Sequence, residues 1–334
     1  MASIKCFLIV ALLSFCVESK VSTPLIKNIH QGGVLSESPL WVNEEGALYW
    51  ADILSQKIFR LEIDTGNVTS KYIGYGPVSL IIRVKDYPKL LLISVRSELY
   101  FLNWDNFEGD KSLRLLTAVD LGHPDNRCND GKVDAKGRLW FGTIGKESGS
   151  WHEKDAASVY MLTENNFRNP EIKIRPVSIS NGIAWSSDNK YMMYIDSSAR
   201  AISVYDFDLE TGKIENGRTL FSFPANNLTG SPDGMTIDRD DNLWVACFND
   251  GKVIKVDPRA GKLLEQHRLP ATKITSVMWG GYDYSTLYVT SASKDLTGSE
   301  LAQQPEAGSV FAITGTGSSG YPMNEFIFKD ADKY

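Results

Sequence analysis

Cysteine and histidine are scarce in this 334-residue chain, with four residues of each. Cys6 and Cys16 fall in an N-terminal apolar segment, which leaves only Cys128 and Cys247 for the rest of the protein. This number excludes a disulfide-rich scaffold, and the sequence alone leaves open whether the two remaining cysteines pair. The four histidines form no H-E-x-x-H zinc motif; they are His30, His123, His152 and His267.

Several other features are missing. The chain has no basic stripe and carries a net charge of −6, which argues against nucleic acid or an anionic membrane surface as a partner. No segment reaches the run of about eighteen apolar residues that a membrane-spanning helix needs. The motif G-x-S-x-G is absent, so a serine-hydrolase elbow is unsupported. Convincing amphipathic helices are absent as well.

Residues 1–19 have the pattern of a cleaved signal peptide. Lys5 supplies the positive start, Cys6 to Val17 is apolar, and Val17-Glu18-Ser19 fits a cleavage site. The apolar run is too short to span a bilayer, although an uncleaved anchor is the alternative. We therefore expect a secreted protein whose residues 20–334 form a single domain.

Two N-x-S/T triplets begin at Asn67 and Asn227. Such triplets are acceptors for N-glycosylation in proteins that pass through the secretory route. They also arise by chance, so they support secretion without proving it. We expect glycosylation at both asparagines.

One strand pattern occurs six times along the chain. Each copy is a short apolar run, usually with an aromatic residue, and the starts are 42, 49, 53, 51 and 44 residues apart. The copies begin at Leu48, Leu90, Leu139, Met192, Leu243 and Leu287. Repeats of this length with about four short strands each are typical of propeller blades.

The segments that follow these runs alternate between polar and apolar residues, as in Lys57 to Ile63 and Lys252 to Asp257. Similar glycine-containing hairpin turns follow some of them, at residues 64–67, 210–213 and 259–262. The sequence therefore predicts an all-β fold, a six-bladed β-propeller of four-stranded blades around a central metal-containing channel. The alternative, two β-sandwiches, would not require the same motif six times.

Polar residues precede four of the repeated runs. They lie in the segments Ser36 to Trp41, Asp125 to Asp130, Ile179 to Trp185 and Ser231 to Asp238. In a propeller these segments would meet at one end of the channel. Glu37, Asn181 and Asp233 would then form an all-oxygen metal site that suits Ca²⁺ or Mg²⁺ and tolerates Zn²⁺ or Mn²⁺. Each residue by itself is better explained as a turn or capping residue, but four such residues at equivalent positions favour a shared site.

Five short motifs stand out along the chain: N-R-x-N-D-G-K-V-D at 126–134, S-N-G-x-x-W at 180–185, P-D-G at 232–234, L-W-V-A-C at 243–247 and Q-P-E-A-G at 304–308. Through these motifs the chain resembles the regucalcin (senescence marker protein), gluconolactonase and luciferin-regenerating enzyme family from about Gly33 to Tyr321. Members of that family fold as six-bladed propellers. The resemblance thus agrees with the repeat pattern.

The resemblance also implies roles for individual residues. It places the metal on Glu37, Asn181 and Asp233, and it makes Asp233 the general base. The residues that it places on the substrate are Arg127, Asn129 and Glu147. The chain departs from the family pattern at Ser36, Cys128 and Ile144-Gly145. We therefore expect a reshaped substrate pocket.

These observations predict a secreted, divalent-metal-dependent hydrolase of lactones or related esters, acting as a monomer or weak dimer. In such a reaction a metal binds the carbonyl oxygen, and donors such as Arg127 and Asn129 stabilise developing charge. The alternative is a propeller that binds calcium or a small ligand without turnover. A third class, a protein-interaction propeller, would not need the set Glu37, Asn181 and Asp233.

Overall fold

The computed structural model describes residues 23–148 and 151–333. The predicted signal peptide lies outside the described residues. No helix within these ranges is both long and apolar enough to cross a membrane. The predicted glycosylation positions Asn67 and Asn227 are both exposed, and their modification stays a prediction.

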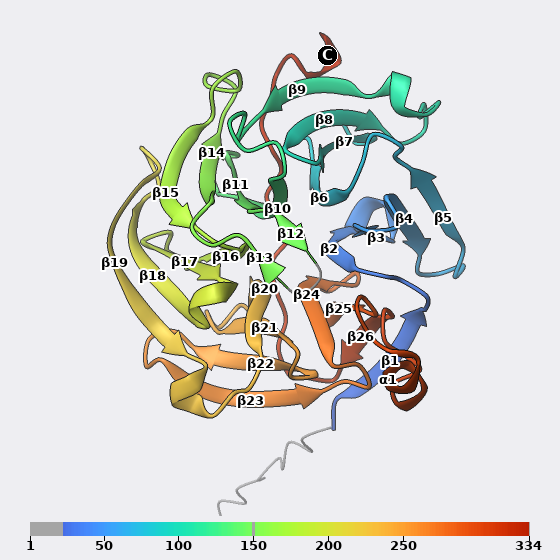
Figure 1. The fold of residues 1–334 in the computed structure, drawn as a ribbon, viewed down its shortest axis with the longest axis vertical. Coiled ribbons are helices and arrows are strands. Elements are labelled where there is room, and N and C mark those ends of the chain that lie inside the picture. The colour runs from blue at the N-terminus through green and yellow to red at the C-terminus, as the bar shows by residue number, and fades with distance from the viewer. Residues whose placement is uncertain (1–22, 149–150, 334) are drawn as a thin grey trace, which may run out of the picture.

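The fold is all-β, as predicted, and its sheets surround a common centre (Figure 1). Four of the sheets are antiparallel with four strands each. The first two sheets contain β2 (Ser36–Val42), β3 (Ala47–Asp52), β4 (Lys57–Glu62) and β5 (Val68–Tyr72), then β6 (Val78–Arg83), β7 (Leu90–Val95), β8 (Glu98–Asn103) and β9 (Arg114–Ala118). The next two contain β10 (Arg127–Val133), β11 (Leu139–Ile144), β14 (Ala157–Leu162) and β15 (Glu171–Val177), then β16 (Ser180–Trp185), β17 (Tyr191–Asp196), β18 (Ala201–Asp208) and β19 (Lys213–Ser222).

The remaining main sheet has eight strands. One half contains β20 (Ser231–Ile237), β21 (Leu243–Phe248), β22 (Lys252–Asp257) and β23 (Lys262–Arg268), and the other contains β24 (Lys273–Gly280), β25 (Thr286–Ala292), β26 (Val310–Thr314) and β1 (Leu25–His30). The two halves are joined through a single residue pair, Phe248 of β21 with Lys273 of β24. The N-terminal strand β1 pairs with β26, so both ends of the chain contribute to this sheet. These sheets are consistent with a propeller.

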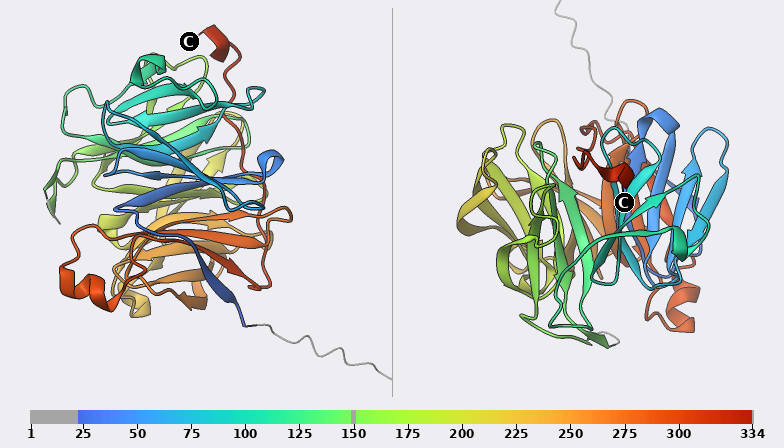
Figure 2. Two further views of the ribbon diagram at one scale, coloured as in Figure 1. Left: turned by 90° about the vertical axis from the view of Figure 1, so that its right-hand side faces the viewer. Right: turned by 90° about the horizontal axis from the view of Figure 1, so that it is seen from above.

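Short elements complete the fold. A two-stranded hairpin, β12 (Glu147–Ser148) with β13 (Trp151–His152), projects from the same face as α1 (Gly298–Gln303) (Figure 2). The 3₁₀ helices are η1 (Asn43–Glu45), η2 (Asp110–Ser112), η3 (Ser197–Ala199), η4 (Pro224–Asn226) and η5 (Ala331–Lys333). The predicted hairpin turns are confirmed, because their glycines Gly66, Gly212 and Gly261 all have positive φ between adjacent strands.

One end strand of each four-stranded group lies nearest the centre and is called its inner strand (Figure 1). Each inner strand contacts the next: β2 contacts β6, β6 contacts β10, β10 contacts β16, β16 contacts β20, β20 contacts β24, and β24 contacts β2. Close contacts explain why glycines occur in the middle of these strands. A Cβ on Gly182 would lie 2.5 Å from the Cβ of Met235 on the next inner strand, and one on Gly131 would lie 2.7 Å from the Cβ of Phe141 on β11 of its own sheet. These glycines are therefore required for close packing.

The hydrophobic core lies between neighbouring sheets. Leu92 and Phe101 of one sheet pack with Phe141 and Leu162 of the next in one cluster. Because each sheet alternates its side chains between two faces, it can bury one face on each neighbour. This arrangement explains the repeated apolar runs without requiring helices.

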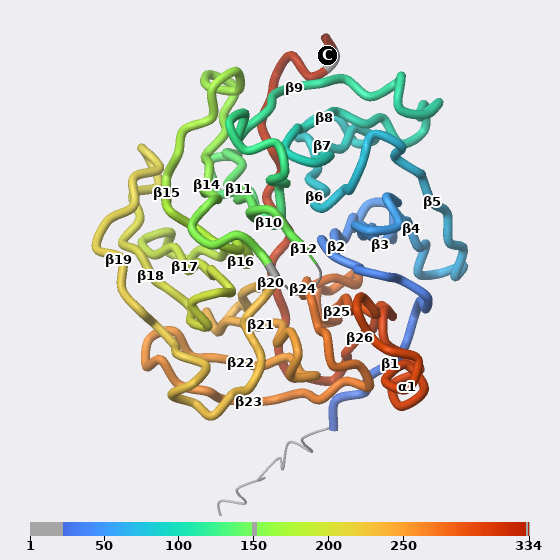
Figure 3. The backbone as a smooth tube through the Cα atoms, in the orientation of Figure 1, coloured from blue at the N-terminus to red at the C-terminus, as the bar shows by residue number. Residues whose placement is uncertain are grey.

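The C-terminal segment after β26 runs along the face opposite the β12–β13 hairpin (Figures 2 and 3). Asn324 Nδ2 donates to the carbonyl oxygen of Val133 at 3.1 Å, and the Phe326 amide donates to that of Arg83 at 2.9 Å. Phe326 itself is fully buried. The segment thus ties the inner strands β6 and β10 together at the far face.

Candidate functional site

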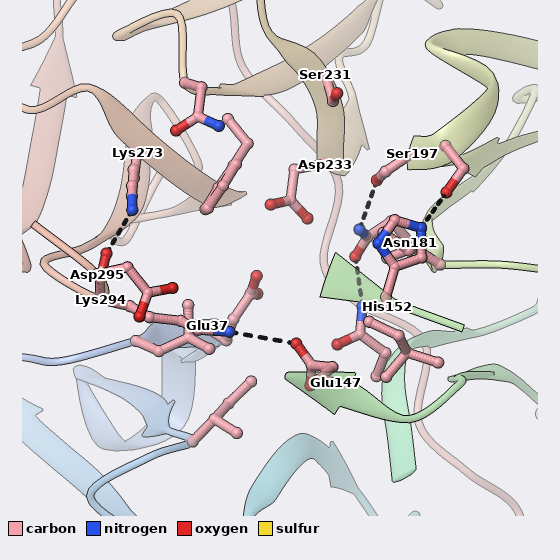
Figure 4. A pocket seen from close by; sticks show the side chains of 18 of the residues that line it. Glu37, Glu147, His152, Asn181, Ser197, Ser231, Asp233, Lys273, Lys294 and Asp295 are labelled. Carbon is pink, nitrogen blue, oxygen red and sulfur yellow. Dashed lines mark hydrogen bonds and ion pairs between the residues drawn. The ribbon is translucent and has the colours of Figure 1, made fainter. Parts of the chain in front are cut away.

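A cavity of about 690 Å³ lies among the inner strands. All six residues predicted from the sequence line it: Glu37, Arg127, Asn129, Glu147, Asn181 and Asp233. They come from β2, β10, β12, β16 and β20. Residues almost 200 positions apart in the chain therefore meet at one place, and many of their side chains point into the same space (Figure 4).

The sequence interpretation was wrong about where these residues sit. It placed them in polar segments that precede the repeated runs and explained each of them, taken singly, as a turn or capping residue. In the structure, Arg127–Val133 is itself an inner strand, and Gly131 lies within it. The repeated runs form the second strands instead, as Leu139–Ile144 does. The close packing between strands explains why these small and polar residues occur within a strand.

Two carboxyl groups in the cavity, those of Glu37 and Asp233, have raised pKa values. Burial, with the nearby charge of Asp130, raises the pKa of Glu37 to about 8. Burial, followed by the charge of Glu37, raises the pKa of Asp233 well above its usual range. Asp233 is only 7% exposed, and its buried Oδ1 has no hydrogen-bond partner among the described residues. A buried carboxylate without a partner is costly unless a cation compensates it.

Hydrogen bonds fix the orientation of Asn181, which is 4% exposed. Its Nδ2 donates to Ser197 Oγ at 2.7 Å, and that hydroxyl donates to the carbonyl oxygen of Pro232 at 2.6 Å. The amide oxygen of Asn181 is thereby turned the other way, where it accepts from Asn129 Nδ2 at 2.9 Å. One lone pair of that oxygen stays available for another partner.

Arg127 links the predicted substrate residues. It donates through Nη1 to Asn129 Oδ1 at 2.6 Å and through Nε to Glu147 Oε2 at 2.8 Å. Lys294 Nζ reaches Glu147 Oε1 at 3.3 Å from the other side of the cavity (Figure 4). Although burial raises the pKa of Glu147, the charges of Arg127 and Lys294 lower it overall. Glu147 is therefore an ionised anchor between two cations.

A second pair of titratable groups, Asp130 and Lys132, follows along the same inner strand. Burial raises the pKa of Asp130, whereas burial lowers that of Lys132 to about 8. Lys132 Nζ donates to the carbonyl oxygen of Met235 at 2.6 Å. The charge of Asp130 contributes to the raised pKa values of both Glu37 and Asp233.

The residues present fit a divalent metal. Glu37, Asn181 and Asp233 offer oxygen donors, which suit Ca²⁺ and Mg²⁺. The orphaned Oδ1 of Asp233 and the raised pKa values of both carboxyl groups are what a cation at this position would relieve. Within the described ranges, no group of three His, Cys, Asp or Glu is arranged to hold a metal. The predicted metal site instead combines two carboxylates, Glu37 and Asp233, with the amide oxygen of Asn181.

The sequence analysis missed several residues of the cavity wall. Ser197 and Arg200 belong to the segment around η3, and Lys273 and Lys294 flank β24 and β25. They follow or begin strands rather than precede the repeated runs, so the search for polar residues before those runs passed over them. Their position at strand ends near the inner strands is the signal that could have found them.

Cys128 and Cys247, the two cysteines within residues 23–148 and 151–333, are free and buried, so they form no disulfide with each other. Cys128 packs in the apolar cluster with Leu99 and Phe141, and it does not line the cavity. Its side chain therefore does not reshape the substrate pocket as its position between Arg127 and Asn129 suggested. Of the other departures, Ile144 lines the cavity, whereas Ser36 is fully buried and is not among the lining residues.

Comparison with known proteins agrees with the family resemblance of the sequence. Residues 35–293 match the family described as the SMP-30/gluconolactonase/LRE-like region. Regucalcin from Sus scrofa is 38% identical over 304 residues, which cover 91% of this chain and 97% of regucalcin. A solved luciferin-regenerating enzyme is 32% identical, with a TM-score of 0.86 over 92% of this chain and 100% of that one.

A solved regucalcin from Agrobacterium tumefaciens, described as a calcium-binding protein, is 23% identical. Its TM-score is 0.80 over 90% of this chain and 96% of that one, which shows the shared fold. The family match and the 38% identity confirm the resemblance that the motifs predicted. The chain belongs to the SMP-30/gluconolactonase/LRE-like family.

Proposed function

We propose that the protein is a divalent-metal-dependent hydrolase of lactones or related esters. The observation that carries this proposal is the orphaned Oδ1 of Asp233 beside Glu37 and the oriented amide of Asn181. A buried oxygen set of this kind, next to the cation Arg127, suits a metal and a substrate with a carbonyl oxygen. The family name, which includes gluconolactonase, supports the same reaction class.

Glu37, Asn181 and Asp233 would hold the metal, with Ca²⁺ or Zn²⁺ favoured and Mn²⁺ or Mg²⁺ possible. When bound, such an ion polarises a carbonyl oxygen and lowers the pKa of water. The chain's own residues then perform the remaining work. In ring opening, water adds to the carbonyl carbon, the bond from that carbon to the ring oxygen breaks, and the ring oxygen takes up a proton to leave as a hydroxyl.

Asp233 is placed to accept the proton of the attacking water. Its Oδ1 has no hydrogen-bond partner among the described residues, which leaves that oxygen open to the water's proton, as general-base catalysis requires. Arg127 and Asn129 offer N–H donors to the substrate's hydroxyls or to the developing negative charge. Glu147 holds the Arg127 guanidinium in place by accepting from Nε and Nη2, both at 2.8 Å.

The alternative function is binding of calcium or a small ligand without turnover. The relative described as a calcium-binding protein favours it, because the same oxygen donors would serve that role. The two functions differ in one measurable respect, which is ring opening. Purified mature protein is incubated with an aldonolactone panel in the presence of Ca²⁺, Zn²⁺, Mn²⁺, Mg²⁺ or chelator, and acid release is followed.

Metal-dependent acid release that is lost in Asp233→Ala supports the lactonase. Metal binding without turnover on the whole panel favours the alternative function. If Asp233→Ala keeps both metal binding and activity, the assignment of the site is wrong. A serine variant outside the cavity, Ser55→Ala, controls for handling of the protein.

We also propose that the sheets form six blades of one propeller in residues 20–334, that the protein is secreted, and that it is a monomer or weak dimer. The mutual contacts of the six inner strands and the division of the eight-stranded sheet at one residue pair support six blades. Expression in a secretory host, followed by N-terminal sequencing and light scattering, tests secretion and oligomeric state. Retention of residues 1–19 on the mature protein would contradict signal-peptide cleavage.

A further inference from the structure

The positive and negative side chains on the cavity wall are not fully paired with one another. The wall carries four cationic side chains, namely Arg127, Arg200, Lys273 and Lys294. It also carries four carboxylates, namely Glu37, Glu147, Asp233 and Asp295. A metal would take up Glu37 and Asp233, and Glu147 is shared by Arg127 and Lys294 at 2.8 Å and 3.3 Å. The cations therefore outnumber the carboxylates that remain for them.

Arg200 is held in place without being neutralised. Its Nε donates to the carbonyl oxygen of Gly230 at 3.0 Å, and its Nη2 donates to those of Leu228 and Thr229 at 2.7 Å and 2.9 Å. Backbone carbonyls orient a guanidinium but carry no net charge. In the part of the chain that the structure describes, no carboxylate forms an ion pair with Arg200. Its positive charge is pre-positioned for an anion from solution.

Lys273, the first residue of β24, is in a similar state. Its Nζ donates to the carbonyl oxygen of Lys294 and lies 5.8 Å from the centre of the Phe248 ring. Burial lowers the pKa of Lys273, the charge of Asp295 raises it, and that of Lys294 lowers it. Asp295 is exposed, and no carboxylate of residues 23–148 or 151–333 is ion-paired with Lys273.

Both cations line the cavity beside two inner strands that contact each other, because Arg200 binds the carbonyl oxygen that precedes β20 and Lys273 begins β24. Arg200 contacts Gly230, whose neighbour Ser231 pairs with Phe248, and Phe248 pairs in turn with Lys273. In the view of Figure 4, Ser231 lies beyond Asp233 as seen from Glu147, and Lys273 lies to one side. A group bound to this wall would therefore sit across the predicted metal site from Arg127 and Glu147.

We propose that the substrate is a lactone that carries a second, acidic group, and that Arg200 and Lys273 bind this group. This inference rests on the proposed lactonase function. The lactone carbonyl lies at Glu37, Asn181 and Asp233, and the acidic substituent extends to the opposite wall. Carboxylate and phosphate share the chemistry that these cations recognise. Water opens the ring as before, so the product carries one carboxylate more than the substrate.

A matched pair of substrates tests the proposal. D-Glucaro-γ-lactone differs from D-glucono-γ-lactone only in having a carboxylate in place of the terminal hydroxymethyl group. We expect kcat/KM to be higher for the acidic lactone by about tenfold or more, the size of a charge-assisted hydrogen bond. This preference should shrink as salt is added, because screening weakens the attraction. A phosphorylated gluconolactone distinguishes phosphate from carboxylate as the preferred acid.

Variants assign the preference to the two cations. Lys273→Met keeps the length of the side chain and removes the charge, and we expect the preference for the acidic lactone to fall by about tenfold. Arg200→Met should have the same effect, although it also removes three bonds to the backbone. Lys146→Met is the control, because Lys146 is an exposed lysine near the Arg127 strand that does not line the cavity.

The outcomes separate the two proposals. No opening of either lactone with any metal contradicts the lactonase function itself. Opening of the neutral lactone as fast as or faster than the acidic one overturns only the inference drawn here about acidic substrates. A preference that survives in Lys273→Met combined with Arg200→Met also overturns it. Retained metal-induced stabilisation in each variant shows that the site has folded.

Discussion

Ser197 Oγ accepts a hydrogen bond from Nδ2 of Asn181 at 2.7 Å and thereby determines which way the amide points. The amide oxygen, the predicted metal ligand, is directed away from Ser197 and toward Asn129. The same hydroxyl donates to the carbonyl oxygen of Pro232, next to Asp233. Ser197 thus connects two predicted ligands on different inner strands without being one of them.

Loss of this hydroxyl is expected to weaken metal binding. In Ser197→Ala the Asn181 amide can rotate, and partners behind a metal ligand typically contribute about 10–100-fold in affinity. Calorimetric titration with Ca²⁺ or Zn²⁺ measures the change. Ser198→Ala is the control, because its exposed hydroxyl contacts His152 instead, at 2.9 Å. Equal affinity of the two variants would contradict a positioning role for Ser197.

Metal-free protein is expected to lose stability as the pH rises. The pKa of Glu37 is raised from 4.5 to about 8 in the folded state, so its contribution is fully present below pH 4.5 and is lost as the pH rises through 8. Added metal should reverse the loss, because it binds the ionised carboxylates of the folded protein. Urea unfolding in chelator from pH 4.5 to 8.5 measures this dependence.

Glu37→Gln is the comparison for this experiment. It should flatten the pH dependence, and the part that remains belongs to groups such as Asp233, whose pKa is raised in the same direction. It should also reduce the stabilisation by metal. An unchanged pH dependence in Glu37→Gln would show that Glu37 does not titrate as described.

Arg127→Met should reduce turnover. Arg127 donates to both Asn129 and Glu147, so its loss removes a donor from the substrate side and releases two neighbours. Removal of a donor to the oxyanion costs about 10²–10³ in kcat, whereas a donor that only orients the substrate affects KM more. Steady-state kinetics with a neutral lactone separates these effects. Arg218→Met, which removes an exposed arginine paired with Asp206, is the control.

Gly182→Ala is expected to destabilise the protein by about 1–3 kcal/mol, as overpacking in a core does. The added Cβ would meet the Cβ of Met235 at 2.5 Å and the carbonyl oxygen of Asp233 at 2.8 Å. Urea unfolding measures the change. Gly298→Ala in α1 is the matched control, because apart from its chain neighbours and the backbone of its own helix no atom lies within 4 Å of the added Cβ. Similar stability of the two variants would contradict close packing of the inner strands.

The strand content of this protein follows from local patterns. Alternating segments such as Lys57 to Ile63 and glycine turns such as Gly66 specify strands and hairpins through side-chain periodicity and a positive φ, which neighbours in sequence are enough to determine. The motifs around Arg127, Asn181 and Asp233 also predicted the family correctly. These properties depend on residues that are close together in the chain.

The details of the site depend on residues that are far apart in the chain. Gly131 lies within β10 because a Cβ there would meet Phe141 of β11. The position of Cys128 between Arg127 and Asn129 suggested a pocket residue, but its side chain packs in the core. The partners Lys294 for Glu147 and Ser197 for Asn181 are separated by 147 and 16 residues. No short-range pattern encodes such contacts, because they form only when the sheets pack around a common centre.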